Sequence, residues 1–416
     1  MSLPPDSAPR AGSRCRWLFL LGVTLAVPGG NASAQTAPAE VRDAAHNSTF
    51  NPWGHLRTSS LRLMAPESTF AELAYSDYHR WVFEYLSWPE VQPLLVAAAL
   101  EPELVALLHD PSIRSVHEAT GGTILRVPDF VRWSLKPKSR EIIYRELASG
   151  MENLTHILPL ILPDSAALER LNFSPGLRAA VRQLTFSRGN HRCLVDADLL
   201  AAHADSPDEM RRLFRQIYTY QVLVVELSRD EISDSPRIAD YWTQHRAKLR
   251  GSLNQLFARS PDLDAIDISH FLPKFPQVLL NTFPDGQTSP FNANCHWLAL
   301  NFFRRIPDSK FLPSQKDHDN SGHEAVMELH AYYDQVEPPF QFGDVIALVA
   351  ESGDAFELVH TAVHIADNIV FSKNGIGRNS PFALITLEEM MAKYAWATEL
   401  TVRGFRPQPG TPALPN

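Results

Sequence analysis

The sequence predicts an α+β fold, in which a mainly helical N-terminal region precedes a small α+β domain with an antiparallel sheet. Two patterns predict this division. Apolar residues recur at helical spacing through much of 65–270, whereas segments within 271–400 alternate in polarity and are rich in β-branched side chains. The chain of 416 residues, 44% hydrophobic and 20% charged, is long enough for two such domains.

The N-terminal 34 residues have the pattern of a secretory signal peptide. Three arginines precede an apolar run at 17–27, which is shorter than the roughly 20 residues that a membrane-spanning helix needs. Ala32, Ser33 and Ala34 then suit signal peptidase cleavage. We therefore expect a secreted or periplasmic protein without membrane attachment after cleavage. Residues 35–64 are polar and mixed, and we expect a loose lead-in there.

The charge of the chain argues against polyanionic partners. The formal net charge is −9, and no long basic run is present. Nucleic acids and anionic membrane surfaces attract proteins with clustered lysine and arginine. We therefore expect neither as a partner.

The helical region contains its clearest signal at 206–227. Ser206, Pro207 and Glu209 are typical of a helix start, and apolar residues follow at helical spacing. A second helix is expected from Ser235, with apolar residues along one side as far as Leu256. The segments 77–86 and 91–108 also read as helical.

The C-terminal part contains three predicted strands and one predicted helix. Asp367 and Asn368 favour a tight turn, which makes the last two strands a hairpin. Thr386 and Glu389 form a capping box before a helix. The proline-rich segment 401–416 is expected to be disordered. The strands are predicted at 342–350, 357–367 and 368–375, and the helix at 387–396.

Cys295 is the first candidate for chemistry. It begins an apolar helical face that continues through Leu298 to Phe303. Asn292 or Asn294 can cap this helix, which would place the thiol in the first turn. Unpaired N–H groups and the helix dipole lower a thiol pKa there. The alternative interpretation is that Cys295 is a small buried hydrophobic residue.

His360 supplies the base that a thiol nucleophile needs. It lies on a predicted strand and shares a face with His364, a competing candidate nearer the turn. If the hairpin turn comprises two residues, Lys373 shares the His360 face; if it comprises three, Ser372 and Asn374 do. Asparagine can accept a hydrogen bond from an imidazole and lysine cannot, so Asn374 is the preferred orienting residue.

The order NCHWLALNFF, FGDVIALV and HTAVHIADNIVFSKNG resembles the core of NlpC/P60-type, papain-like cysteine peptidases over residues 285–395. The resemblance implies a papain-like catalytic domain at 271–400, with Cys295 as nucleophile and His360 as base. It also implies an amide or peptide substrate, with cell-wall peptides as the substrate class. This chain departs from the family at Asn294 and His296, which flank the cysteine. No cofactor or metal is expected for this chemistry.

Two other interpretations remain open from the sequence. One is a secreted binding or scaffold protein in which Cys193 and Cys295 form a disulfide. The other is a metal-binding protein centred on 317–330, where Asp317, Asp319 and Glu328 fall at calcium-loop spacing. Ser321 and Gly322 also fit that spacing, and three histidines in the same segment could suggest zinc. The alternative to any metal is a solvated surface loop.

Overall fold

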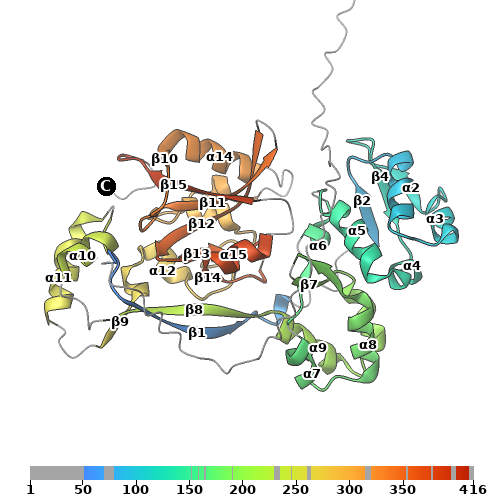
Figure 1. The fold of residues 1–416 in the computed structure, drawn as a ribbon, viewed down its shortest axis with the longest axis horizontal. Helices are drawn as coiled ribbons and strands as arrows, with labels where there is room; N and C mark the ends of the chain where they lie inside the picture. The colour runs from blue at the N-terminus through green and yellow to red at the C-terminus, as the bar shows by residue number, and fades with distance from the viewer. Residues whose placement is uncertain are drawn as a thin grey trace, which may run out of the picture. The chain divides into compact units, whose positions relative to one another are not determined.

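The computed structural model confirms an α+β fold (Figure 1). It describes fewer residues than the sequence contains, and the predicted signal peptide at 1–34 lies outside the described part. The described ranges are 51–69, 79–150, 152–157, 159–163, 165–189, 191–228, 235–244, 246–259, 264–313, 320–352, 355–375, 378–394 and 400–411.

Proline positions help to explain where helices begin in the N-terminal region. Proline is the first residue of four helices there, where its missing N–H costs no intrahelical hydrogen bond. Ser206 caps the last of these, as predicted, with its side chain accepting from Glu209 N at 3.3 Å. The helices are α2 (Trp88–Ala97), α3 (Pro102–Leu108), α4 (Asp129–Ser134), α5 (Pro137–Leu147), α6 (Leu154–Ile157), α7 (Ser165–Arg170), α8 (Pro175–Leu184) and α9 (Pro207–Ile217).

Two small antiparallel sheets also lie in this region. The helix predicted over 77–86 is wrong for residues 80–83, which form strand β2 (Arg80–Phe83). Its consecutive aromatic and β-branched residues favour a buried strand. The other strands are β3 (Arg114–Val116) and β4 (Thr123–Arg126), in the order β2-β4-β3, and β5 (Leu160–Ile161), β6 (Phe186–Arg188) and β7 (His191–Leu194), in the order β5-β7-β6.

The helix predicted over 206–227 is correct only as far as Ile217. Residues beyond it form β8 (Thr219–Ser228), which pairs along its length with β1 (Leu56–Met64) and at one end with β9 (Ala265–Asp267) (Figure 1). Three valines in this segment favour a strand and override the helical spacing. The expected loose lead-in is likewise wrong for the nine residues of β1.

The C-terminal part of the chain contains a six-stranded antiparallel sheet in the order β10-β15-β11-β12-β13-β14. The predicted hairpin is present, with Asp367 at a φ of 53° in its turn. The expected disorder of 401–416 is wrong for β15, because backbone pairing on both edges holds that segment. The strands are β10 (Tyr333–Val336), β11 (Val345–Ser352), β12 (Ala355–Ala366), β13 (Ile369–Lys373), β14 (Phe382–Thr386) and β15 (Leu400–Pro407).

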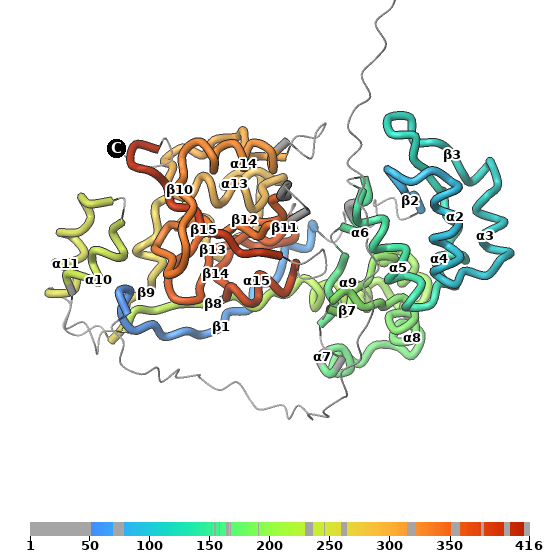
Figure 2. Tube along the Cα trace, turned by 45° about the horizontal axis from the view of Figure 1, so that its top comes forward, coloured from blue at the N-terminus to red at the C-terminus, as the bar shows by residue number. Residues whose placement is uncertain are grey.

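Both faces of this sheet are packed. One face forms a large core with α13 (Cys295–Leu300) and α14 (Asn320–Tyr332), which lie together in Figure 2. The other face packs against α15 (Leu387–Tyr394), whose capping box at Thr386 and Glu389 is as predicted. The single helix predicted from Ser235 is instead α10 (Ser235–Trp242) and α11 (Arg250–Arg259), and α12 (Lys274–Leu279) follows.

Candidate functional site

Cys295 is the first residue of α13, which packs against β12 and β13. Asn294 caps the helix as predicted, because its side-chain oxygen accepts from Trp297 N at 2.9 Å. The Asn294 amide also donates to Ser321 Oγ at 3.1 Å, which ties the cap to α14. The helix ends at Leu300, earlier than expected, although Phe302 and Phe303 still lie in the same core. The thiol therefore has a fixed position in a first helical turn.

His360 lies on β12 and is fully buried. Its Nε2 is 3.0 Å from Ser372 Oγ, and Ser372 Oγ donates to Asn374 Oδ1 at 3.2 Å. Because the Ser372 hydroxyl donates its proton to Asn374, the serine oxygen accepts a hydrogen bond from the Nε2–H of His360. The Nδ1 of a neutral ring then carries the lone pair. It is buried and makes no hydrogen bond within the described part of the chain.

A β-bulge decides which residue contacts His360. The turn contains two residues, Asp367 and Asn368, but the register shifts by one between His364 and Ala366. This shift brings Ser372 and Asn374 onto the His360 face, the arrangement that the sequence predicted for a three-residue turn. Ser372 makes the direct contact, and Asn374 acts one hydrogen bond further away.

The electrostatic surroundings of Cys295 favour the thiolate. Burial raises the pKa of the thiol, because the charged form loses water, but the imidazoles of His296 and His360 lower it. The net result is a pKa well below the ordinary range. Sequence analysis singled out His296 only as a departure from a family pattern, since spacing does not show that an imidazole beside a nucleophile turns toward it.

Lys373 is a buried amine in the same site. Burial lowers its pKa to about 7, while the charge of Cys295 acts in the opposite direction. Its Nζ lies 5.7 Å from the centre of the Phe382 ring and 3.4 Å from the Gly375 carbonyl oxygen. The side chain is thus held away from His360, and it does not orient the imidazole.

His364 and Tyr394 are two other ring side chains of the elements around His360. Both ring nitrogens of His364 contact backbone carbonyl oxygens, of Gln341 at 3.1 Å and Asp367 at 2.9 Å, so this histidine is held near the turn. The Tyr394 ring of α15 stacks on His360 with centroids 4.4 Å apart and planes at 25°. Tyr394 covers the imidazole, and nothing in the sequence spacing indicated this contact.

The disulfide expected under the scaffold interpretation is wrong. Cys193 and Cys295 are both free and buried. Cys193 lies on β7 in the core of the N-terminal region, where burial raises the pKa of its thiol to about 11. Cys193 is therefore a protonated core residue at neutral pH, in contrast to Cys295.

The alternative of a metal-binding segment centred on 317–330 does not fit the residues that the structure describes there. Asp317, His318 and Asp319 lie outside the described residues. Residues from 320 onward form α14, and Glu328 accepts from Arg304 at 2.7 Å and Lys310 at 2.8 Å. A helix whose acid binds two cationic side chains does not provide a calcium loop.

Two groups of potential metal ligands occur within the described ranges, and both lie in the N-terminal region. In the first, the Arg132 guanidinium already binds the two carboxylates, at 2.6 Å each. In the second, Arg80 binds one of the two glutamates at 2.6 Å. Neither group includes Cys295. They are His79, Asp129 and Asp198, and Glu84, His117 and Glu152.

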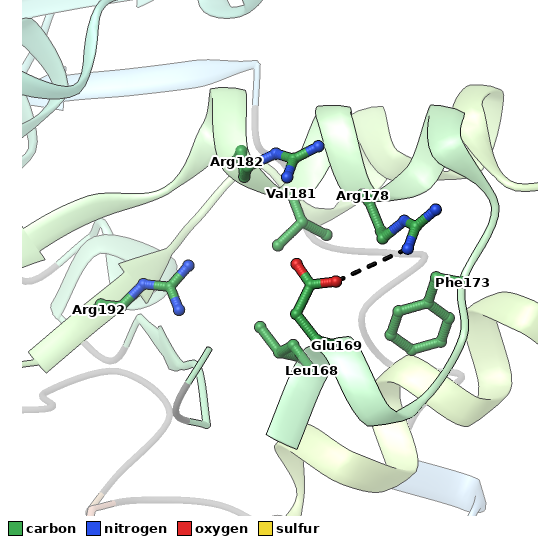
Figure 3. Close-up of a pocket in the computed structure, with 7 residues that line it drawn as sticks. All are labelled: Leu168, Glu169, Phe173, Arg178, Val181, Arg182 and Arg192. Atoms are coloured by element: carbon green, nitrogen blue, oxygen red, sulfur yellow. Dashed lines mark ion pairs between the residues drawn. The ribbon is translucent and has the colours of Figure 1, made fainter. Parts of the chain in front are cut away.

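A small basic pocket lies in the N-terminal region, formed by α7, α8 and β7 (Figure 3). Three arginines surround Glu169, which approaches Arg178 at 3.7 Å. The apolar part of the lining is Leu168, Phe173 and Val181. None of the residues around Cys295 contributes to this pocket.

No family model, curated protein or solved structure matches this chain. Within the described residues, no helix has the length and apolar character needed to cross a bilayer.

Proposed function

We propose that this protein is a thiol hydrolase that cleaves amide bonds through an acyl-enzyme intermediate on Cys295. One observation carries the proposal. A hydrogen-bonded chain from His360 through Ser372 to Asn374 leaves Nδ1 of His360 as the basic nitrogen, and this imidazole lowers the pKa of a thiol in the first turn of a helix. A nucleophile, a base and an orienting group are the parts that this chemistry requires.

The reaction proceeds in two stages. His360 Nδ1 takes the proton of Cys295, and the sulfur attacks the amide carbonyl carbon to form a tetrahedral intermediate. The C–N bond then breaks, and His360 Nδ1 returns its proton to the leaving amine. In the second stage His360 removes a proton from water, which attacks the thioester and releases the acid and the free thiol.

Ser372 and Asn374 act through His360. They fix its tautomer and ring orientation, as the third group of a catalytic triad does. The substrate class follows from the family resemblance and the predicted export signal, which together favour peptide bonds of the cell wall. The buried thiol and the ring of Tyr394 above His360 imply that substrate entry requires local opening of this cover.

The test is hydrolysis of isolated cell-wall peptides by the wild-type protein and by the Cys295→Ala and His360→Gln variants. We expect both variants to lose hydrolysis, and Cys295→Ala also to lose iodoacetamide labelling of the peptide that contains residue 295 at neutral pH. Cys193→Ser is the matched control and should keep both activities, because burial raises the pKa of the Cys193 thiol to about 11 and keeps it protonated at that pH. Hydrolysis that survives in Cys295→Ala would exclude the proposal.

A further inference from the structure

His296 is a second imidazole of the candidate site and follows the nucleophile directly in α13. Its side chain is 6% exposed, and its Nδ1 lies 3.2 Å from Thr361 Oγ1. Thr361 is fully buried on β12. A buried hydroxyl therefore holds this ring in one orientation, as Ser372 holds the ring of His360.

The two imidazoles are held from opposite sides of one strand. Thr361 and His360 are consecutive residues of β12, so their side chains leave opposite faces. His296 contacts Thr361 on one face of the strand. Ser372 and Tyr394 contact His360 on the other face. Both rings nevertheless lower the pKa of the Cys295 thiol.

We propose that His296 is a second catalytic residue, which donates a hydrogen bond to the Cys295 thiolate, and that Thr361 is its positioning residue. This inference rests on the proposed function, in which Cys295 is the nucleophile. With the Thr361 hydroxyl donating to Nδ1, the ring carries its proton on Nε2 and can offer it to the sulfur. His296 thus stabilises the thiolate without giving up a proton, and His360 remains available to protonate the leaving amine.

A hydrogen bond from a second donor favours the charged form of the thiol. Within the described residues, the groups that interact electrostatically with Cys295 are His296 from α13, His360 from β12, Lys373 from β13 and Tyr394 from α15. Of these, the two histidines lower the pKa of the Cys295 thiol. Removal of the His296 donor must therefore move the midpoint of thiolate formation to higher pH.

The experiment measures the rate of iodoacetamide alkylation of the full chain against pH, scored by mass spectrometry on the peptide that contains Cys295. We expect His296→Leu to raise the midpoint by at least about one pH unit, a tenfold loss of thiolate below it. His296→Gln, which retains an N–H donor, should raise it less. Thr361→Val should also raise it, and Thr361→Ser should restore the wild-type value.

A wild-type midpoint in His296→Leu, or in Thr361→Val if His296→Leu does not fold, would overturn the inference. Circular dichroism establishes folding of each variant. The two proposals fail separately. If Cys295→Ala loses hydrolysis but the His296 variants keep the wild-type midpoint of thiolate formation, only the proposed role of His296 is rejected. If the midpoint shifts in the His296 variants but Cys295→Ala keeps full hydrolysis, only the proposed hydrolase function is rejected.

Discussion

Replacement of Lys373 by methionine should stabilise the protein, in a way that depends on pH. The amine is fully buried, and its pKa falls from the ordinary 10.5 to about 7 because burial penalises the charged form. Each factor of ten in a proton-binding constant is worth about 1.4 kcal/mol, so keeping the ammonium folded costs about 5 kcal/mol at low pH. Methionine has a similar length and removes this cost.

The direction of this pH dependence follows from proton binding by Lys373 in the folded and unfolded states. Between pH 7 and 10.5 the unfolded chain keeps the lysine proton and the folded chain has lost it. The free energy of unfolding of the wild type therefore rises with pH across this window, relative to the variant. Below pH 7 both states bind the proton, and the full cost is present.

Urea denaturation at several pH values measures this effect. From about pH 6 to about pH 9.5 the advantage of Lys373→Met should shrink by about 3 kcal/mol. Lys138→Met is the matched control, because this lysine is 73% exposed and pairs with Glu141 on the surface of α5. Its effect should stay within about 0.5 kcal/mol at every pH. An equal effect of Lys373→Met at all pH values would refute the reasoning.

Two further predictions concern stability and access. Asp344 is fully buried and accepts from Arg406 at 2.9 and 2.7 Å, so Asp344→Asn should lower the free energy of unfolding by about 3 kcal/mol in urea titrations; a loss below about 1 kcal/mol would contradict this. Tyr394→Ala should speed iodoacetamide alkylation of Cys295 severalfold at fixed pH, because it removes the ring above the base. The exposed Tyr332→Ala is the control, and equal rates in both variants would argue against a covering role.

The sequence predicted those parts of the site that depend on local pattern. Asn294 followed by an apolar stripe indicated the start of α13, and alternation with a favourable turn pair indicated the β12–β13 hairpin. These features arise from interactions between residues close in the chain. The placement of Cys295 at a helix start and of His360 on a strand therefore needed no tertiary information.

The remaining features depend on contacts between distant residues. The bulge after His364 changes the partner of His360, and a turn pair alone does not show it. Tyr394 reaches the imidazole only because α15 packs on that face of the sheet. β8 was mistaken for helix since its apolar residues satisfy helical spacing and alternation together, and its pairing with β1 decided between them.

The position of β15 has a consequence for biosynthesis. This strand follows the other five in the chain yet lies between β10 and β11. Before residues 400–407 have been synthesised, the sheet lacks the interior strand β15. One long edge of β11 is then open to solvent or to other chains. Such an arrangement delays closure of the sheet until synthesis of β15 is complete.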